Sequence, residues 1–78
     1  MSYAAPRPAK LKIQLETKVI GTTTKNMQKI GKKVQVQRNP SQPGMFIVWI
    51  SKKELAQVPA EKLTDTIEYT DGRPEGWQ

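Results

Sequence analysis

Basic residues in the first half of the chain have the types and spacing that phosphate binding requires. Four lysines fall between positions 25 and 33, and asparagine and glutamine residues lie among them. Ammonium groups pair with phosphates, whereas side-chain amides can bond to the edges of bases. The predicted nucleic-acid-binding residues are Lys25, Asn26, Lys29, Lys32, Lys33 and Arg38. Lys10, Lys12 and Lys18 extend the same predicted surface.

The distribution of charge along the chain supports this interpretation. The 78 residues carry 13 Lys and Arg against 7 Asp and Glu, a net charge of +6. Residues 1–38 hold nine basic residues and one acidic residue, a net charge of +8, whereas residues 39–78 hold four and six, a net charge of −2. An asymmetric positive field attracts polyanions, and counterion release makes their binding salt-dependent. The sequence therefore predicts a small basic regulatory protein that binds DNA or RNA.

The composition argues against enzyme chemistry. The chain has no cysteine and no histidine, which removes a thiolate nucleophile, a disulfide framework and the usual general base and zinc ligand. Its acidic residues form no recognisable catalytic pair, and no glycine-rich phosphate loop occurs. We expect no catalysis, no cofactor, no bound metal and no small-molecule substrate.

Membrane and secretory roles are not expected either. No apolar run approaches the roughly 18 residues that a membrane span needs. The first eight residues lack the apolar core of a secretory signal. The prediction is a cytoplasmic protein without a membrane partner.

A protein partner is the alternative function. A small basic chain with an apolar β-hairpin can dock on a larger protein or assembly through a strand edge and its C-terminal tail. Trp49 and Trp77 would be the anchor residues. Packing in the core is the favoured role for Trp49, and for Trp77 it is an equal alternative to anchoring. Phe46 and Trp49 have opposite parity on one strand, so an aromatic stacking surface for single strands is not expected.

Periodicity predicts the strands that would position these residues. Residues 10–19 begin with apolar and polar residues in alternation, and residues 33–38 repeat that pattern. Residues 45–50 form a continuous apolar run, typical of a strand covered on both faces. Turn-forming residues at 39–44 predict that the last two strands form an antiparallel hairpin. Residues 66–70 are a candidate fourth strand.

Two short helices are predicted between the strands. Thr22 to Thr24 offer N-cap hydroxyls for a helix at 23–30, with a long hairpin loop as the alternative. Ser51 and Glu54 match a capping box, which predicts a helix at 52–57. Pro59 can open a further short helical turn.

Residues 20–30 are similar in outline to the turn and second helix of small winged helix-turn-helix proteins such as phage excisionases. The hairpin at 34–50 would then be the wing. The likeness departs from that pattern at residues 11–20, where the first helix should lie, because they have strand periodicity. Membership of that family is not predicted.

Together these patterns predict an α+β fold, with a small antiparallel sheet of three or four strands and one or two short helices. One domain would span residues 10–71, between a flexible arm at 1–9 and a tail at 72–78. The predicted core consists of Leu11, Ile13, Leu15, Ile30, Val34, Val36, Phe46, Val48, Ile50, Leu55 and Leu63.

Overall fold

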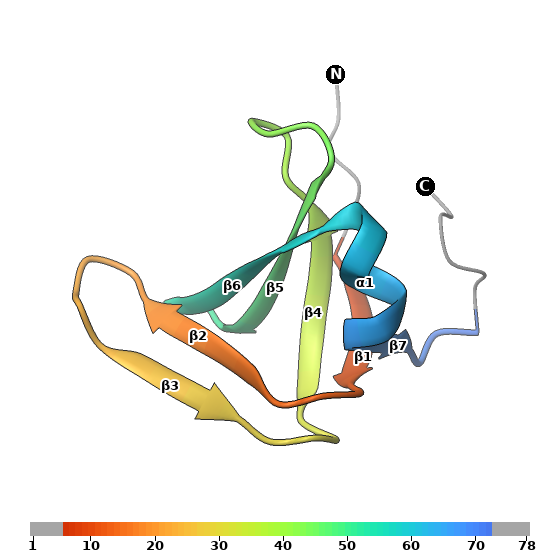
Figure 1. The fold of residues 1–78 in the computed structure, drawn as a ribbon, viewed down its shortest axis with the longest axis horizontal. Coiled ribbons are helices and arrows are strands. Elements are labelled where there is room, and N and C mark those ends of the chain that lie inside the picture. Colours follow the sequence, from red (N-terminus) through yellow and green to blue (C-terminus); the bar gives the residue numbers. More distant parts are fainter. Residues whose placement is uncertain (1–5, 73–78) are drawn as a thin grey trace.

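The computed structural model describes residues 6–72, which form seven strands and one short helix (Figure 1). In chain order the elements are β1 (Arg7–Leu11), β2 (Leu15–Val19), β3 (Lys25–Gln28), β4 (Lys33–Arg38), β5 (Met45–Ser51), β6 (Glu54–Pro59), α1 (Ala60–Thr66) and β7 (Ile67–Tyr69).

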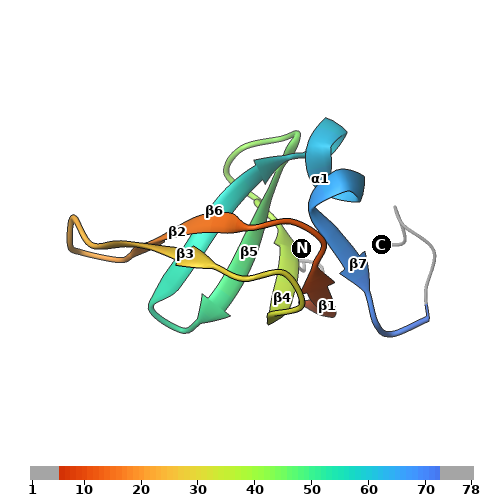
Figure 2. The same ribbon diagram turned by 60° about the horizontal axis from the view of Figure 1, so that its bottom comes forward.

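All seven strands belong to one antiparallel sheet. Their order across the sheet is β3-β2-β6-β5-β4-β1-β7, so β4 and β5 lie near its middle and β3 and β7 at its two edges. Figure 1 shows the sheet curled into a half-barrel, and α1 packs against β5, β6 and β7. Figure 2 shows the β2–β3 hairpin extending away from the rest of the molecule.

The core lies on the inner face of the curled sheet. Alternate residues of the strands point into it, as the burial of Val34 and Val36 between exposed neighbours on β4 shows. Leu63 covers the core from α1. The buried apolar cluster comprises Ala9, Leu11, Val34, Val36, Val48, Val58, Leu63 and Ile67, and Leu15, Phe46, Ile50 and Tyr69 pack against it.

The predicted α+β fold of three or four strands is therefore wrong, because the protein is mostly sheet. The prediction undercounted strands in two ways. It joined two strands into one at residues 10–19, and it assigned helices to two segments that pair as strands. Each error has a local physical reason.

Residues 10–19 do not form a single strand, because β1 and β2 have different neighbours. β1 pairs with β4 and β7, whereas β2 pairs with β3 and β6. The chain therefore crosses from one part of the sheet to another at residues 12–14. Ile13 lies in this crossing and is 44% exposed, so its predicted place in the core is also wrong.

The predicted helix at 23–30 is replaced by a hairpin that contains β3. The Thr22 hydroxyl donates to the Val19 carbonyl and accepts from the Thr24 N–H, so it serves a turn rather than a helix N-terminus. Gly31 has a φ of +89° and follows β3 in the turn to β4. Ile30 is 66% exposed rather than part of the core. The winged helix-turn-helix outline is likewise absent from this segment.

The predicted helix at 52–57 is a turn followed by β6. Ser51 does accept the Lys53 N–H, as a capping serine would, but the chain turns there from β5 into β6. Ala56 and Val58 point inward and Gln57 outward, a period of two that suits a strand. Leu55 is half-buried on the outer side rather than in the core. A helix does begin after Pro59, as α1.

The predicted hairpin of residues 33–38 and 45–50 is confirmed as β4 and β5. The candidate strand at 66–70 corresponds to β7.

β1 begins at Arg7, inside the segment predicted as an arm. The Arg7 guanidinium lies 3.6 Å from the centroid of the Tyr69 ring, and its Nε and Nη2 each donate to Asp71 at 2.9 Å. Residues 1–5 and 73–78 lie outside the described residues.

Candidate nucleic-acid interface

The outer face of the sheet, directed away from the core, carries a band of polar and basic side chains across β1, β4 and β5. Because Val34 and Val36 point inward, Lys33, Gln35 and Gln37 point outward. Strand register adds their neighbours: Lys10 is paired with Lys33, and Trp49 with Gln35. Residues from three separate stretches of sequence therefore meet on one face.

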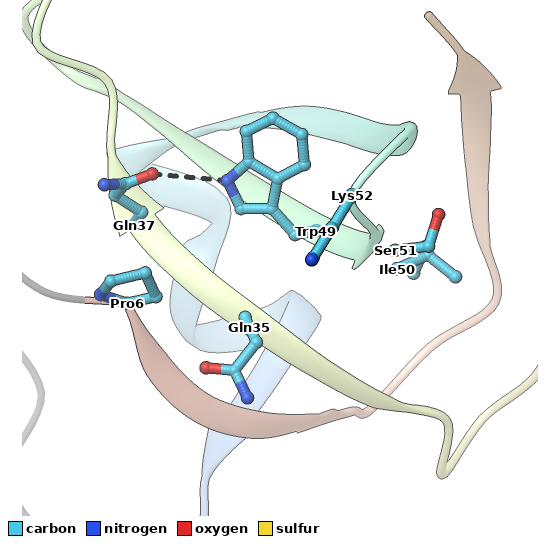
Figure 3. A pocket seen from close by; sticks show the side chains of 7 residues that line it. All are labelled: Pro6, Gln35, Gln37, Trp49, Ile50, Ser51 and Lys52. Atoms are coloured by element: carbon cyan, nitrogen blue, oxygen red, sulfur yellow. Dashed lines mark hydrogen bonds between the residues drawn. The ribbon is translucent and has the colours of Figure 1, made fainter.

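Two shallow hollows lie side by side on this face. The first has a volume of about 540 Å³ and is lined by Pro6, Gln35, Gln37, Trp49, Ile50, Ser51 and Lys52 (Figure 3). The second, of about 600 Å³, is lined by Pro8, Ala9, Lys10, Lys33, Val34, Gln35, Trp49, Ile50 and Thr70. Gln35, Trp49 and Ile50 belong to both, so the hollows form one continuous surface, which we call the Trp49 surface.

Trp49 is held in a defined orientation at the centre of this surface. Its indole N–H donates to the Gln37 side-chain oxygen at 3.2 Å, the bond drawn in Figure 3. Its strand neighbours are Gln35 on β4 and Leu55 on β6. The indole is half-buried and faces away from the core, so the core-packing interpretation of Trp49 does not describe its position.

Lysines line both hollows of the Trp49 surface. Lys52 lines the first hollow, whereas Lys10 and Lys33 line the second. Lys10 and Lys33 are directly paired on neighbouring strands, an arrangement of like charges that disfavours the folded state. Glu68 of β7 is paired with Lys10 on its other side and offsets part of this repulsion. An anion between the two ammonium groups would offset the remainder.

A second pair of lysines lies on the outer face of the β2–β3 hairpin. Lys18 and Lys25 are directly paired, and Leu55 lies on the other side of Lys18. Glu16 and Gln57 line the same shallow depression. The basic outer surface therefore continues beyond the Trp49 surface, although a carboxylate interrupts it.

The sequence-predicted site residues are not brought together. Lys25 and Lys33 point outward from strands that lie four positions apart in the sheet. Lys29 and Lys32 lie in the turn between β3 and β4, where the Lys32 N–H donates to the Lys29 carbonyl. Arg38 is at the far end of β4 from Lys33, about 17 Å along the strand. Its guanidinium is 6.0 Å from the Phe46 ring centroid.

Asn26 has a structural role on the inner side of the hairpin. Its amide donates to the Glu54 carboxylate at 2.8 Å, and the buried Thr17 hydroxyl donates to the same oxygen at 2.8 Å. Gln28 donates to the Thr17 hydroxyl at 3.1 Å. The hydrogen bonds from Asn26 and Thr17, with the nearby charge of Lys32, lower the pKa of Glu54 below its ordinary value. This cluster fastens β2 and β3 to β6.

Sequence reasoning missed most of the Trp49 surface. Gln35, Gln37 and Lys52 received no role, and Pro6 was assigned to the arm. Alternation along β4 was a usable signal, because it groups Lys33, Gln35 and Gln37 on one face. Alternation does not show that β4 pairs with β1, because these two strands are far apart in the sequence. Trp77 lies outside the described residues.

Comparison with family models, curated proteins and solved structures gave no match to this chain. Within residues 6–72, no helix has the length and apolar character that crossing a membrane requires.

Proposed function

We propose that this protein binds nucleic acid through the Trp49 surface. The observation that carries the proposal is the direct pairing of Lys10 with Lys33 beside an outward-facing tryptophan. Like charges on directly paired residues weaken a sheet, and a phosphate is an anion that two such lysines can bind together. The side-chain amide of Gln35 supplies a donor and an acceptor next to the phosphate contacts.

The charge balance of the outer face supports the same ligand. Its strand residues include the lysine pairs Lys10–Lys33 and Lys18–Lys25, and Lys52 follows in the turn after β5. The carboxylates that interrupt them are Glu16 and Glu68. This excess of positive charge agrees with the net charge of +6 of the whole chain. Such a surface increases the local concentration of a polyanion and speeds its association.

The test is the salt dependence of binding to a labelled oligonucleotide, measured by fluorescence anisotropy. The double variant Lys10→Gln and Lys33→Gln removes two phosphate contacts. We expect weaker binding, with the slope of log K against log salt concentration reduced by about 2, or about 1 for each lysine.

The matched control is Lys29→Gln with Lys62→Gln. It removes the same charge from exposed positions outside both hollows. A retained slope in the control, together with a reduced slope in the first variant, supports the Trp49 surface. Equal losses in the two variants would mean that binding depends on net charge alone, and absence of binding by the unmodified protein would contradict the proposed function.

A protein partner at β3 is a second candidate function. β3 is an edge strand that exposes Met27, and Ile20 and Ile30 are exposed close to its ends. Their side chains are 59%, 54% and 66% exposed. An exposed edge with apolar side chains can accept a strand from a partner chain. A partner that stays bound after nuclease digestion and is lost with Met27→Lys would favour this function.

A further inference from the structure

We infer that the ligand of the Trp49 surface is single-stranded nucleic acid, with an unpaired base stacked on the indole of Trp49. This inference rests on the proposed function and specifies its ligand. The stacking residue is one tryptophan on the outer face, and Phe46, which lies on the opposite face of β5, takes no part.

The indole is already positioned for stacking. Its N–H is bonded to Gln37, and it is half-buried between strands β4 and β6. A side chain fixed before binding loses little conformational freedom when the ligand arrives. Every base has a flat π-face, so stacking on an aromatic ring needs no particular sequence.

Three lysines lie close to Trp49, at one end of the β4–β5 pair. Lys33 begins β4 and is paired with Lys10, and Lys52 directly follows the last residue of β5. Phosphates next to a base stacked on Trp49 would meet these ammonium groups at that end. Gln35 lines both hollows and can bond to the edge of the base.

A duplex fits this surface less well. Its bases are stacked on one another, so their faces are not available to the indole. The major groove admits a helix or a two-stranded ribbon. β4 and β5 instead lie inside the sheet with a neighbouring strand on each side, so they cannot enter a groove. The Trp49 surface could contact only the phosphates of a duplex.

The experiment compares three labelled probes: an oligothymidylate and an oligouridylate of about 16 nucleotides, and a DNA duplex of the same length. Binding is measured for the full chain and for Trp49→Ala, Trp49→Phe and Leu55→Ala. We expect Trp49→Ala to weaken single-strand binding by between about 5-fold and 150-fold. Trp49→Phe should retain most of the affinity, because it keeps an aromatic ring.

Leu55→Ala is the matched control. Leu55 is paired with Trp49 on the same face but lines neither hollow of the Trp49 surface, so its truncation should leave affinity unchanged. Equal losses from Leu55→Ala and Trp49→Ala would mean that the tryptophan only supports the sheet. The two single strands separate a preference for DNA from one for RNA.

A spectroscopic readout keeps the test valid if Trp49→Ala does not fold. In the Trp77→Phe variant, Trp49 is the remaining tryptophan of the chain. We expect the oligothymidylate or the oligouridylate to quench its fluorescence and the duplex to leave it nearly unchanged. Tight single-strand binding without quenching would overturn stacking while leaving the proposed function in place. Failure of all three probes to bind would overturn both.

Discussion

Two carboxylates illustrate how differently two regions of this sheet are held together. Asp71 lies beside β1 and β7, where it receives two hydrogen bonds from the buried Arg7. Glu54 lies between β6 and the β2–β3 hairpin, where its hydrogen-bond donors are the uncharged side chains of Thr17, Asn26 and Gln28. The side chains of Arg7 and Asp71 are only 10% and 18% exposed, whereas Asn26 is exposed to solvent.

The difference follows from what each region packs against. β1, β4, β5 and β7 surround the apolar cluster, so burial stabilises them. Leu15 of β2 packs against that cluster, but next to β6 the hairpin presents polar side chains and Met27 lies in solvent, so hydrogen bonds supply much of its attachment. The Trp49 surface lies on the first region, which suits a site that must hold its residues in place.

The largest loss of stability is expected from a substitution in the apolar core. Ile67 is 0% exposed, and Ile67→Ala should lower the free energy of unfolding by about 2–5 kcal/mol, because it leaves a cavity. Urea denaturation measures the loss. Ile30→Ala is the control, and it should change stability by less than about 0.5 kcal/mol because Ile30 is 66% exposed. Similar losses in the two variants would contradict the division between core and hairpin.

A smaller loss of stability is expected when the ion pair between Arg7 and Asp71 is broken. Asp71→Asn removes the charge that faces the Arg7 guanidinium, and we expect a loss of about 1–3 kcal/mol in the free energy of unfolding. Asp65→Asn is the control: Asp65 is an exposed carboxylate on α1, and its replacement should be nearly neutral. No difference between these variants in urea denaturation would mean that the pair contributes little.

The smallest expected effect is on the stability of the β2–β3 hairpin alone, and it depends on pH. Because the pKa of Glu54 is lowered in the folded protein, its ionised form stabilises the hairpin at pH values above the ordinary 4.5. This stabilisation is lost as the pH falls through the lowered pKa. Amide exchange protection of β3 should therefore decrease at acidic pH, while that of β4 stays constant.

Glu54→Gln provides the control for this pH dependence. Its hairpin should be less protected at neutral pH and should show no further loss on acidification. If the hairpin of the unmodified protein kept its protection at acidic pH, the Glu54 cluster would not be what attaches it.

The pattern of neighbouring residues in the sequence predicted part of the fold, and it predicted a smaller part of the candidate interface. The β4–β5 hairpin was predictable because inward and outward residues alternate on β4 and turn residues separate the strands. Residues 51–54 misled the prediction, because a capping box was present but Glu54 bonds to Thr17 and Asn26 instead, 37 and 28 positions away in the chain. A local motif cannot report such distant partners.

The same limit applies to the candidate interface. Lys33 was predicted from its place in a basic run, but its partner Lys10 and its neighbour Trp49 were found only from strand register. Arg38 belonged to the same run, and the strand carries it to the opposite end of β4.

By itself, the amino-acid sequence determined the net charge of +6, the absence of cysteine and histidine, and the period-two pattern that gives β4 an inner and an outer face. Tertiary structure alone decided which lysines meet and that Trp49 faces outward near them. The physical reason is that composition and alternation are properties of neighbouring residues. Pairing between distant strands instead depends on how the whole sheet folds around its core.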